Sequence, residues 1–577
     1  MPRRRVTPRT PPHSRDRETR MPGKPRKGVA ILGGGVAGMS AAHELAHRGF
    51  HVTVFDSKTV PGGKARSIFL PGTGTRGRRD LPGEHGFRFL PSFYKHLPDT
   101  MKRIPFGRRT VYDNLVPTSR TMIARQDPPL DLEVLTHFPR SLDDLRDLLR
   151  VRPSDLNIPT DDLLFLAQRI WILLTTSRAR RIGEYDDIAW WDFIEADKRS
   201  PMFGKFMGDI AVRALVALNP RKASTKTIGS VGLQLWLDHF KPGVHVDRLL
   251  NGPTHDAWIG PWLAHLQQMG VDYRLCSRVE EIRCQNDRIV DVLIREADGS
   301  SYTFSDDYYI AALPVERMLA LMTDELRESE PRLANLNQIQ TDWMTGIQFF
   351  LDVDVRLTKG HLVMADSPWG LTAISQRQFW DDYDFSRFGD GRVDGILSVV
   401  VSNWDAKGDQ IPKPARECTR DEIIREVWEE LKLHLNDSGE VYLSDSNLLH
   451  SYLADSCCEC DGGWINEEPL LMNTVGSWKH RPPAVTSIHN FFLASDYVQT
   501  HTDLATMESA NEAARRAVNG ILEASGSHEP KCEVWNLDEP LLFEPLKLLD
   551  EQLFRRGLPH AMYDPGTRSR PSRISWF

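Results

Sequence analysis

The most regular pattern in the chain lies near its start, where a short apolar run is followed by glycines and then by helical periodicity. Val29–Leu32 is apolar and partly β-branched, which is typical of a buried strand. The glycine-rich run Gly33–Gly38 opens a helical pattern that continues to His47. His51–Phe55 repeats the strand pattern and is followed by Asp56. This order predicts a strand–helix–strand (βαβ) unit.

Further apolar segments recur at the lengths of strands and helices. Strand patterns occupy residues 272–275, 289–295, 302–304, 308–312 and 490–494. Helical patterns occupy residues 161–176, 421–436 and about 505–522. Residues 541–554 form an amphipathic stretch, and a polar tail rich in Arg, Ser and Pro follows it. The mixture of strands and helices predicts an α/β fold.

Charge is distributed unevenly along the 577 residues. The net charge is −7, but the first 27 residues carry ten Lys or Arg against Asp16 and Glu18, so this arm stands at +8 and the remainder at −15. An acidic body lacks the broad basic face that nucleic acid binding requires. Residues 1–27 contain almost nothing apolar to offset their ordering entropy, so we interpret them as a disordered basic arm.

Cysteine usage and hydropathy bear on the compartment. Seven cysteines in a chain of this length do not make a disulfide framework, which favours a reducing environment. No window reaches the roughly 18 apolar residues of a membrane span, and no apolar segment follows the arginine-rich start. We therefore expect a cytoplasmic protein, or one that contacts a membrane peripherally without crossing it.

The strongest chemical motif is Gly33-x-Gly35-x-x-Gly38 in the predicted βαβ unit. The first glycine permits the tight turn, the second lets backbone approach a pyrophosphate, and the third allows close helix–strand packing. Asp56 lies 23 residues after Gly33, at the end of the second strand, where a carboxylate binds an adenosine ribose. The combination predicts a dinucleotide site.

Two other patterns suggest metal sites. His43-Glu44-Leu45-Ala46-His47 has the H-E-x-x-H spacing of zinc peptidases. The face of this helix that carries Leu45 must pack on the sheet, so we expect His43, Glu44 and His47 to face solvent. Cys457-Cys458-Glu459-Cys460 has adjacent cysteines, which fit a tetrahedral site poorly. We predict no metal at either place.

Three further segments carry a resemblance to a known family. They are Pro61–Ser67, with its Gly62-Gly63 pair, Glu84-His85-Gly86-Phe87-Arg88-Phe89, and the stretch Ala494–Ala510. A fourth is Leu250-Asn251-Gly252-Pro253, followed by Gly270–Ile282. With the glycine fingerprint, they resemble the FAD-dependent amine oxidase superfamily, and within it the branch of phytoene and carotenoid desaturases and hydroxysqualene dehydroxylases. The resemblance extends over residues 28–524.

The resemblance implies an α/β fold with a Rossmann-type FAD-binding domain built from discontinuous segments. These segments would be residues 28–95, 246–320 and 480–524. Residues 96–245 and 321–479 would form an inserted substrate domain of mixed α+β structure, and residues 525–577 a C-terminal extension.

The same resemblance implies roles for individual residues in binding FAD. Gly33, Gly35, Gly38 and Asp56 would hold its ADP half, and Gly63, Lys64 and Arg66 would line its phosphate and flavin side. Gly86 lies in the segment expected beside the flavin. The backbone of Val279 would pair with adenine, Asp496 would bind the pyrophosphate or the ribityl chain, and Met507 would lie near the isoalloxazine.

Two residues are candidates for the chemistry. Arg88 stands where desaturases usually carry His, and a guanidinium is a poor base, so it would orient an anionic group or stabilise negative charge. His85 is the nearest titratable neighbour, and a catalytic role and a structuring role for it remain equally open.

The substrate region is indicated by aromatic residues and by one apolar helix. Tryptophan-rich blocks could cradle a long apolar or planar ligand; the candidates are Trp343, Trp369, Trp380, Trp464, Trp478 and His480. Most tryptophans pack in protein cores, so we prefer a core role for any single one of them. The apolar segment 163–174, followed by Arg178, Arg180 and Arg181, is either a membrane-dipping helix with basic flanks or, as we prefer, a buried helix.

These observations lead to one principal hypothesis and two alternatives. The chain is expected to be an FAD-dependent oxidoreductase that desaturates a lipophilic, isoprenoid-like substrate by hydride transfer to flavin N5, with oxygen or a quinone as electron acceptor. The enzymatic alternative is an amine or amino-acid oxidase that produces hydrogen peroxide. A third possibility is a non-catalytic FAD-containing assembly partner.

Overall fold

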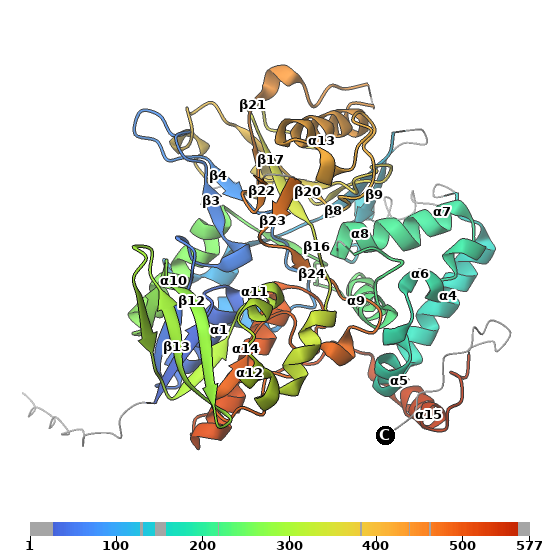
Figure 1. The fold of residues 1–577 in the computed structure, drawn as a ribbon. Coiled ribbons are helices and arrows are strands. Elements are labelled where there is room, and N and C mark those ends of the chain that lie inside the picture. The colour runs from blue at the N-terminus through green and yellow to red at the C-terminus, as the bar shows by residue number, and fades with distance from the viewer. Residues whose placement is uncertain are drawn as a thin grey trace, which may run out of the picture.

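The computed structural model describes residues 27–126, 131–144, 157–216, 218–380, 383–437, 439–460 and 463–562. Residues 1–26 of the predicted basic arm lie outside this set, as do residues 563–577 of the C-terminal extension. Figure 1 shows a lower-left region of strands and helices, an upper sheet region and a helical region on the right.

A five-stranded parallel sheet forms the centre of the first region. Its order is β11-β2-β1-β15-β25. The strands are β1 (Gly28–Leu32), β2 (His51–Phe55), β11 (Asp272–Arg274), β15 (Tyr308–Ala311) and β25 (Phe491–Leu493). Together with α1 (Val36–His47), β1 and β2 confirm the predicted βαβ unit. The sheet is thus assembled from three widely separated parts of the sequence.

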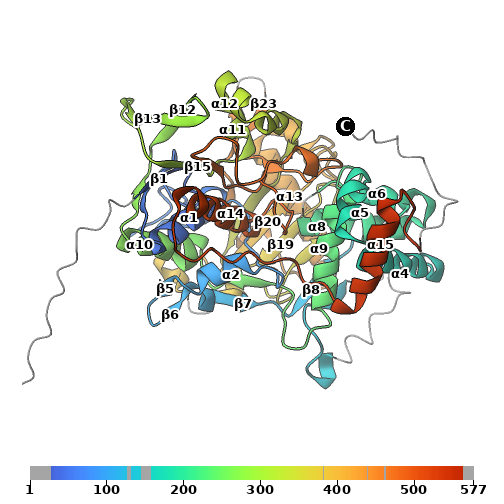
Figure 2. The ribbon, with the colours of Figure 1, turned by 90° about the horizontal axis from the view of Figure 1, so that it is seen from below.

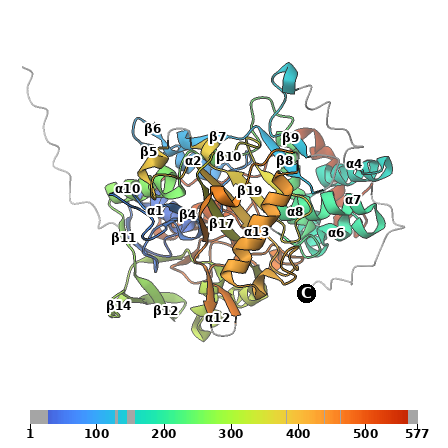
Figure 3. The ribbon, with the colours of Figure 1, turned by 90° about the horizontal axis from the view of Figure 1, so that it is seen from above.

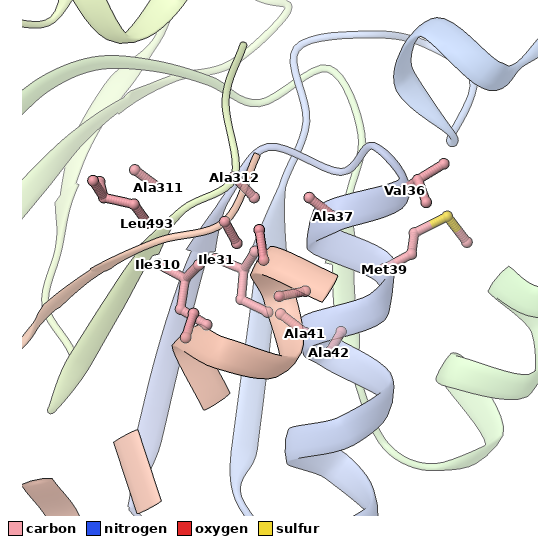
Figure 4. Close-up of a cluster of buried hydrophobic side chains, with 14 of the residues drawn as sticks. Ile31, Val36, Ala37, Met39, Ala41, Ala42, Ile310, Ala311, Ala312 and Leu493 are labelled. Carbon is pink, nitrogen blue, oxygen red and sulfur yellow. The ribbon is translucent and has the colours of Figure 1, made fainter. Parts of the chain in front are cut away.

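Two helices and a small antiparallel sheet accompany the parallel sheet. α14 (Met507–Ser525) packs on α1, and the amide of Asn511 donates to Ser40 Oγ across that contact at 2.8 Å. Figure 4 shows apolar side chains of α1 meeting those of β1, β15 and β25 in the core. The antiparallel sheet consists of β12 (Arg278–Gln285), β13 (Arg288–Arg295) and β14 (Ser301–Phe304).

The second region is a seven-stranded sheet with the order β21-β17-β20-β19-β18-β8-β9. The strands are β8 (Arg120–Ala124), β9 (Leu132–Leu135), β17 (Thr345–Leu351), β18 (Leu362–Met364), β19 (Thr372–Ser375), β20 (Gly395–Val401) and β21 (Leu448–Leu453). Neighbours are antiparallel except for β18 and β8. α13 (Arg420–Leu435) lies across this sheet in Figure 3 and buries Ile423, Val427 and Leu431 against it.

The third region is helical. It contains α4 (Thr160–Thr175), α5 (Arg178–Gly183), α6 (Trp190–Phe193), α7 (Pro201–Phe203), a π-helical turn (Gly204–Ile210), α8 (Ala211–Val216) and α9 (Thr225–Asp238). α4 and α9 pack against each other.

The C-terminal extension runs over the outside of the molecule and ends in a short turn (Leu541–Phe543) and α15 (Glu544–Arg555). Figure 2 shows α15 beside α4 and α5, and the three helices are in contact. The extension also bonds to α2 (His96–Met101) and to α9: the backbone N–H of Trp535 donates to His96, and that of Asp538 donates to Gln234, both at 3.0 Å.

Short elements connect the three regions. They are β3 (Ser67–Phe69), β4 (Pro82–Glu84), α2 (His96–Met101), β5 (Pro105–Phe106), β6 (Arg109–Thr110), β7 (Leu115–Pro117), β10 (Arg248–Leu250), α10 (Gly260–Gln268), α11 (Val315–Ala320), α12 (Asp324–Ser329), β16 (Thr341–Asp342), β22 (Cys457–Cys460), β23 (Gly463–Asn466) and β24 (Leu470–Leu471).

The H-E-x-x-H segment of α1 is placed differently from the expectation. His47 is exposed, but His43 and Glu44 are buried. The indole N–H of Trp262 donates to His43 at 3.2 Å, and Glu44 pairs with Arg48 and Arg103. The expectation of a solvent-facing side was wrong because α10 and the extension cover a second face of α1, which the pattern of a single βαβ unit does not reveal.

Candidate active site

A cavity of about 710 Å³ opens at the carboxyl ends of β1, β2 and β15. Its lining comes from the glycine loop, the ends of β2 and β15, the 85–94 loop, α9, the 467–473 segment and the start of α14. Eleven of the thirteen predicted site residues line it: Gly33, Gly35, Asp56, Gly63, Lys64, His85, Gly86, Arg88, Val279, Asp496 and Met507.

The glycine loop leaves an open space at the N-terminus of α1. Gly33 has φ +109°, and a Cβ there would lie 2.5 Å from the carbonyl oxygen of Ala312. A Cβ on Gly35 would have only the Cα of Gly63, at 3.7 Å, within 4 Å. Gly35 is also the N-cap of α1 and supplies no side-chain cap, so the first N–H groups of the helix have no side-chain acceptor there. These features suit a phosphate group.

The third glycine of the motif does not line the cavity but is needed behind it. A Cβ on Gly38 would lie 1.9 Å from the carbonyl oxygen of Gly33, so a larger residue would force α1 away from β1. This is the packing role that the motif predicts for its last glycine.

Asp56 carries an unsatisfied oxygen at the end of β2. Its Oδ1 accepts a 3.0 Å hydrogen bond from the N–H of Lys58. Its Oδ2 is buried and bonds to no residue that the structure describes. Burial raises the pKa of this carboxyl. A buried acceptor that faces a cavity is positioned to receive hydroxyl donors from a ligand.

The two basic residues after the Gly62-Gly63 pair have different surroundings. Lys64 lines the cavity, with Nζ 3.2 Å from the carboxylate of Glu316. Arg66 is not among the lining residues, and its guanidinium donates to both oxygens of Glu468 at 2.8 and 3.0 Å. Arg66 and the other surrounding cations hold the pKa of Glu468 down at about 2, despite its burial. Arg66 was expected to lie beside a phosphate of the cofactor. In the structure it does not line the cavity, and Glu468 neutralises its charge.

His85 is a buried neutral imidazole. Burial lowers its pKa to about 3. Its Nδ1 lies 3.2 Å from Ser456 Oγ, while Nε2 bonds to no residue within the described ranges. His85 lines the cavity, and whether its Nε2 carries the proton depends on the hydrogen bond that Nδ1 makes with Ser456.

Arg88 joins two loops. One guanidinium nitrogen donates to the carbonyl of Gly86 at 2.8 Å and another to that of Lys64 at 2.7 Å. Burial lowers the pKa of Arg88, although a guanidinium remains protonated. Two of its donors are thus used to hold the cavity wall together.

Asp496 and Met507 approach the cavity from the last strand and the last long helix. Asp496 follows β25, and its carboxylate accepts a 3.2 Å bond from Ser495 Oγ. Met507 is the first residue of α14, where Thr506 caps the helix by accepting from the N–H of Ser509. Val279 contributes from β12, where its backbone pairs with Ile294.

Another part of the cavity wall is apolar. It is formed by Phe89, Phe93, Leu218, Val231, Leu235, Met344, Val400 and Met472. None of the aromatic candidates from the sequence, Trp343, Trp369, Trp380, Trp464, Trp478 and His480, is among the described residues that line this cavity. Trp369 is fully buried in the core of the second sheet, which agrees with the preferred interpretation that it packs in a core.

The structure also describes the apolar segment 163–174, its basic flank and the residues that could bind a metal. In the apolar segment of α4, Ile172 and Leu173 are buried, whereas Leu164 and Trp171 are exposed. Arg180 and Arg181, its proposed basic flank, pair with Asp550 and Glu539 of the extension. Within the described ranges, no group of three or more His, Cys, Asp or Glu side chains could hold a metal ion.

Several contributors to the site had no recognisable signal in the sequence. Glu468 and Ser456 lie 402 and 371 residues from their partners Arg66 and His85. Tyr273, whose hydroxyl donates to the carbonyl of Gly34, lies in a strand that was predicted without a role. Only the folded arrangement reveals them.

Comparison with known proteins adds a family assignment. A family model described as "Flavin containing amine oxidoreductase" matches residues 36–522. A 15-cis-phytoene desaturase from Synechococcus elongatus is 22% identical over 507 residues, which cover 86% of this chain and 95% of that protein. A zeta-carotene desaturase from Arabidopsis thaliana is 23% identical, with 87% of this chain and 86% of that protein covered.

Solved structures share the fold at low identity. The cyclohexylamine oxidase from Brevibacterium oxydans superposes with a TM-score of 0.58 at 13% identity, over 87% of this chain and all of that chain. A putrescine oxidase bound to putrescine gives 0.58 at 12% identity, over 86% and 99%. Of the helices in the described part of the chain, none is both long and apolar enough to cross a membrane.

Proposed function

The chain belongs to the family of flavin-containing amine oxidoreductases, and from that membership we propose that it is an FAD-dependent dehydrogenase that desaturates a lipophilic, isoprenoid-like substrate. The relatives that match along nearly their whole lengths carry the names of phytoene and zeta-carotene desaturases. We propose that oxygen or a quinone accepts the electrons from the reduced flavin.

The proposed domain arrangement follows the parallel sheet. Residues 28–95, 246–320 and 480–524 would form a Rossmann-type FAD-binding domain, because its five strands come from these three segments. The second sheet and the helical region, residues 96–245 and 321–479, would form the substrate domain.

The residues at the glycine end fit an ADP group. The space before Gly35 and the N-terminus of α1 would take the pyrophosphate, and the unsatisfied Oδ2 of Asp56 would accept from a ribose hydroxyl. Val279 would lie beside the adenine. Gly63, Lys64, Asp496 and Met507 would hold the rest of the cofactor, since all four line the same cavity.

Bound FAD would supply a hydride acceptor at N5, and the chain's own residues would prepare the substrate for it. The apolar wall, with Phe93, Val231 and Leu235, would orient an apolar chain and exclude water. His85 would present a neutral nitrogen, which is able to donate or accept a proton at Nε2. Arg88 would hold the loops around Lys64 and Gly86 together through its two hydrogen bonds to their carbonyl oxygens.

The observation that carries the proposal is the contrast within one cavity. One part offers a glycine loop and the unsatisfied Oδ2 of Asp56, which suit a dinucleotide, while another part of the wall is built from Phe, Leu, Val and Met side chains. Such a wall favours a hydrocarbon over a charged substrate.

An anaerobic titration tests the proposal. Purified full-length protein with bound FAD is mixed with phytoene or squalene in detergent, and then with a panel of amines and amino acids, while the absorbance of oxidised flavin is followed. We expect isoprenoids to bleach the flavin and amines to leave it unchanged. Bleaching by an amine with release of peroxide in air would replace the proposal with the oxidase, and a flavin that no compound reduces would favour a non-catalytic role.

A further inference from the structure

Lys64 and Arg66 each pair with a carboxylate, and the two acids are compensated to different degrees. Arg66 donates to both oxygens of Glu468 at 2.8 and 3.0 Å. Burial favours a higher pKa for Glu468, but Arg66 and other cations hold it at about 2. Lys64 lies with Nζ 3.2 Å from Oε1 of Glu316, yet burial raises the pKa of Glu316 in spite of this cation. The second pair therefore contains a carboxylate that is poorly stabilised as an anion.

Glu316 lies in the cavity wall just after β15. It is the second residue of α11 and lines the cavity together with Lys64 and Asp496. Both of its carboxylate oxygens are shielded from solvent, and Oε2 bonds to no residue in the described part of the chain. Lys64 stabilises its ionised form, and the negative charge of Asp496 opposes it. Glu316 is therefore a buried, incompletely bonded acid in the cavity that is proposed for the cofactor.

Lys64 is the residue that Glu316 and the cofactor would share. Its ammonium also donates to the carbonyl oxygen of Pro469, and the proposed function places it among the residues that hold FAD. The pyrophosphate of FAD is a dianion, and a nearby negative charge disfavours the ionised form of a carboxyl. If Lys64 turned to a phosphate oxygen, an ionised Glu316 would be left buried near Asp496 without its counter-charge, which is a costly arrangement.

We propose that Glu316 is a further residue of the cofactor site and takes up a proton when FAD binds, an inference that rests on the FAD site of the proposed function. In the protein alone, the ammonium of Lys64 pairs with ionised Glu316. On binding, a proton from solvent adds to one carboxylate oxygen of Glu316, and Lys64 donates to a phosphate oxygen instead. The neutral carboxyl gains an O–H donor, which suits an anionic neighbour.

The linkage between proton and cofactor has a definite sign. Burial raises the pKa of Glu316 above its ordinary value of 4.5 in the protein alone, and the phosphates would raise it further. Between these two pKa values, binding takes up about one proton, so the affinity for FAD increases as the pH falls. Asp56 acts in the opposite direction, because its ionised form would accept the ribose hydroxyl. That contribution is common to wild type and Glu316 variants, so the difference between them reports Glu316.

Calorimetric titration with FAD tests the inference without substrate. Full-length protein stripped of FAD is titrated over a pH series in pairs of buffers with different heats of ionisation, which gives the number of protons exchanged. The test variant is Glu316→Gln, which keeps the shape of the side chain but is neutral at every pH. Glu316→Asp keeps a carboxyl at the position. The matched control is Glu328→Gln, the same change at an exposed residue of α12 that does not line the cavity.

We expect wild type, Glu316→Asp and Glu328→Gln to take up a proton on binding FAD that Glu316→Gln does not take up. In alkaline solution Glu316→Gln should bind FAD about tenfold more tightly than wild type, the factor for a rise of about one pH unit in the pKa of Glu316 on binding. This advantage should vanish in acid, where wild-type Glu316 is protonated before FAD arrives. Loss of a merely structural ion pair would weaken binding instead.

Two results would overturn the inference. One is equal proton exchange in wild type and Glu316→Gln, with parallel pH profiles. The other is weaker binding by Glu316→Gln throughout the series, which would show that ionised Glu316 accepts a hydroxyl of the cofactor. Because the titration involves no turnover, proton uptake in a protein whose flavin no isoprenoid bleaches would reject only the proposed function, and the reverse result would reject only the role of Glu316.

Discussion

The glycine end of the cavity and the loop end around His85 are built in different ways. At the glycine end, a tight turn, a helix N-terminus and one carboxylate come from residues 33–56, within a single βαβ unit. At the loop end, Arg66 meets Glu468 and His85 meets Ser456 across 402 and 371 residues. The first end is a local motif, whereas the second exists only after distant segments have folded together.

The largest expected effect lies at the glycine end. Gly35→Val leaves room for its Cβ in the protein alone but places a side chain in the proposed pyrophosphate space. We expect FAD binding to weaken by about 100-fold, the factor for roughly 3 kcal/mol of overlap, while the protein still folds. The absorbance of the purified variant and FAD titration measure this. Gly232→Val, at a glycine whose Cβ meets nothing within 4 Å, is the control. A yellow Gly35→Val protein would refute the assignment.

At the loop end, the largest effect should be on stability. Glu468→Gln leaves Arg66 buried without its counter-charge and should lower the free energy of unfolding by about 3 kcal/mol. Glu467→Gln, its exposed neighbour, should change little. Urea titration measures both. If both variants lost the same stability, the pair would not be what holds this loop.

The pH dependence of that stability has a definite sign. The pKa of Glu468 is lowered to about 2 from an ordinary value of 4.5, so its contribution is complete above pH 4.5 and is lost as the pH falls towards 2. The difference between wild type and Glu468→Gln should therefore be constant near neutrality and shrink in acid.

A smaller effect is expected for the carboxylate at the glycine end. Asp56→Asn removes the negative charge that would accept a ribose hydroxyl and should weaken FAD binding about tenfold. Since burial raises the pKa of Asp56, wild-type affinity should fall in acid as the carboxyl takes up a proton, and the variant should lack this fall. Isothermal titration over a pH series distinguishes the two, and parallel pH curves would contradict the assignment.

The smallest effect concerns His85. Its pKa of about 3 keeps it neutral, so turnover should show no step near pH 6.5 from this residue. The unfolded chain, with its ordinary pKa of 6.5, takes up the proton first, and His85 should therefore reduce stability progressively as the pH falls from 6.5 towards 3. A limb near pH 6.5 in kcat/KM that disappears in His85→Gln would contradict a neutral imidazole.

The contrast between the two ends also explains what could be predicted from sequence. Periodicity located β1, α1, β2, α13 and α14 because each carries its own apolar pattern, and spacing located Asp56. The charge of Arg66 was evident, but its neutralisation by Glu468 depends on a contact 402 residues away. The tryptophans could not be assigned one by one, because composition does not distinguish a core indole such as Trp369 from one that faces a ligand.

The order of strands in the parallel sheet has a consequence for biosynthesis. β1 lies between β2 and β15, so one of its edges stays unpaired until about 280 further residues have been translated. At about 5–20 residues per second, the nascent chain would expose that edge for roughly a quarter of a minute to a minute. Met507, at the start of α14, leaves the ribosome still later. The cavity proposed for the cofactor is thus completed near the end of synthesis. Until then, ribosome-associated chaperones would have to keep the unpaired edge of β1 from aggregating.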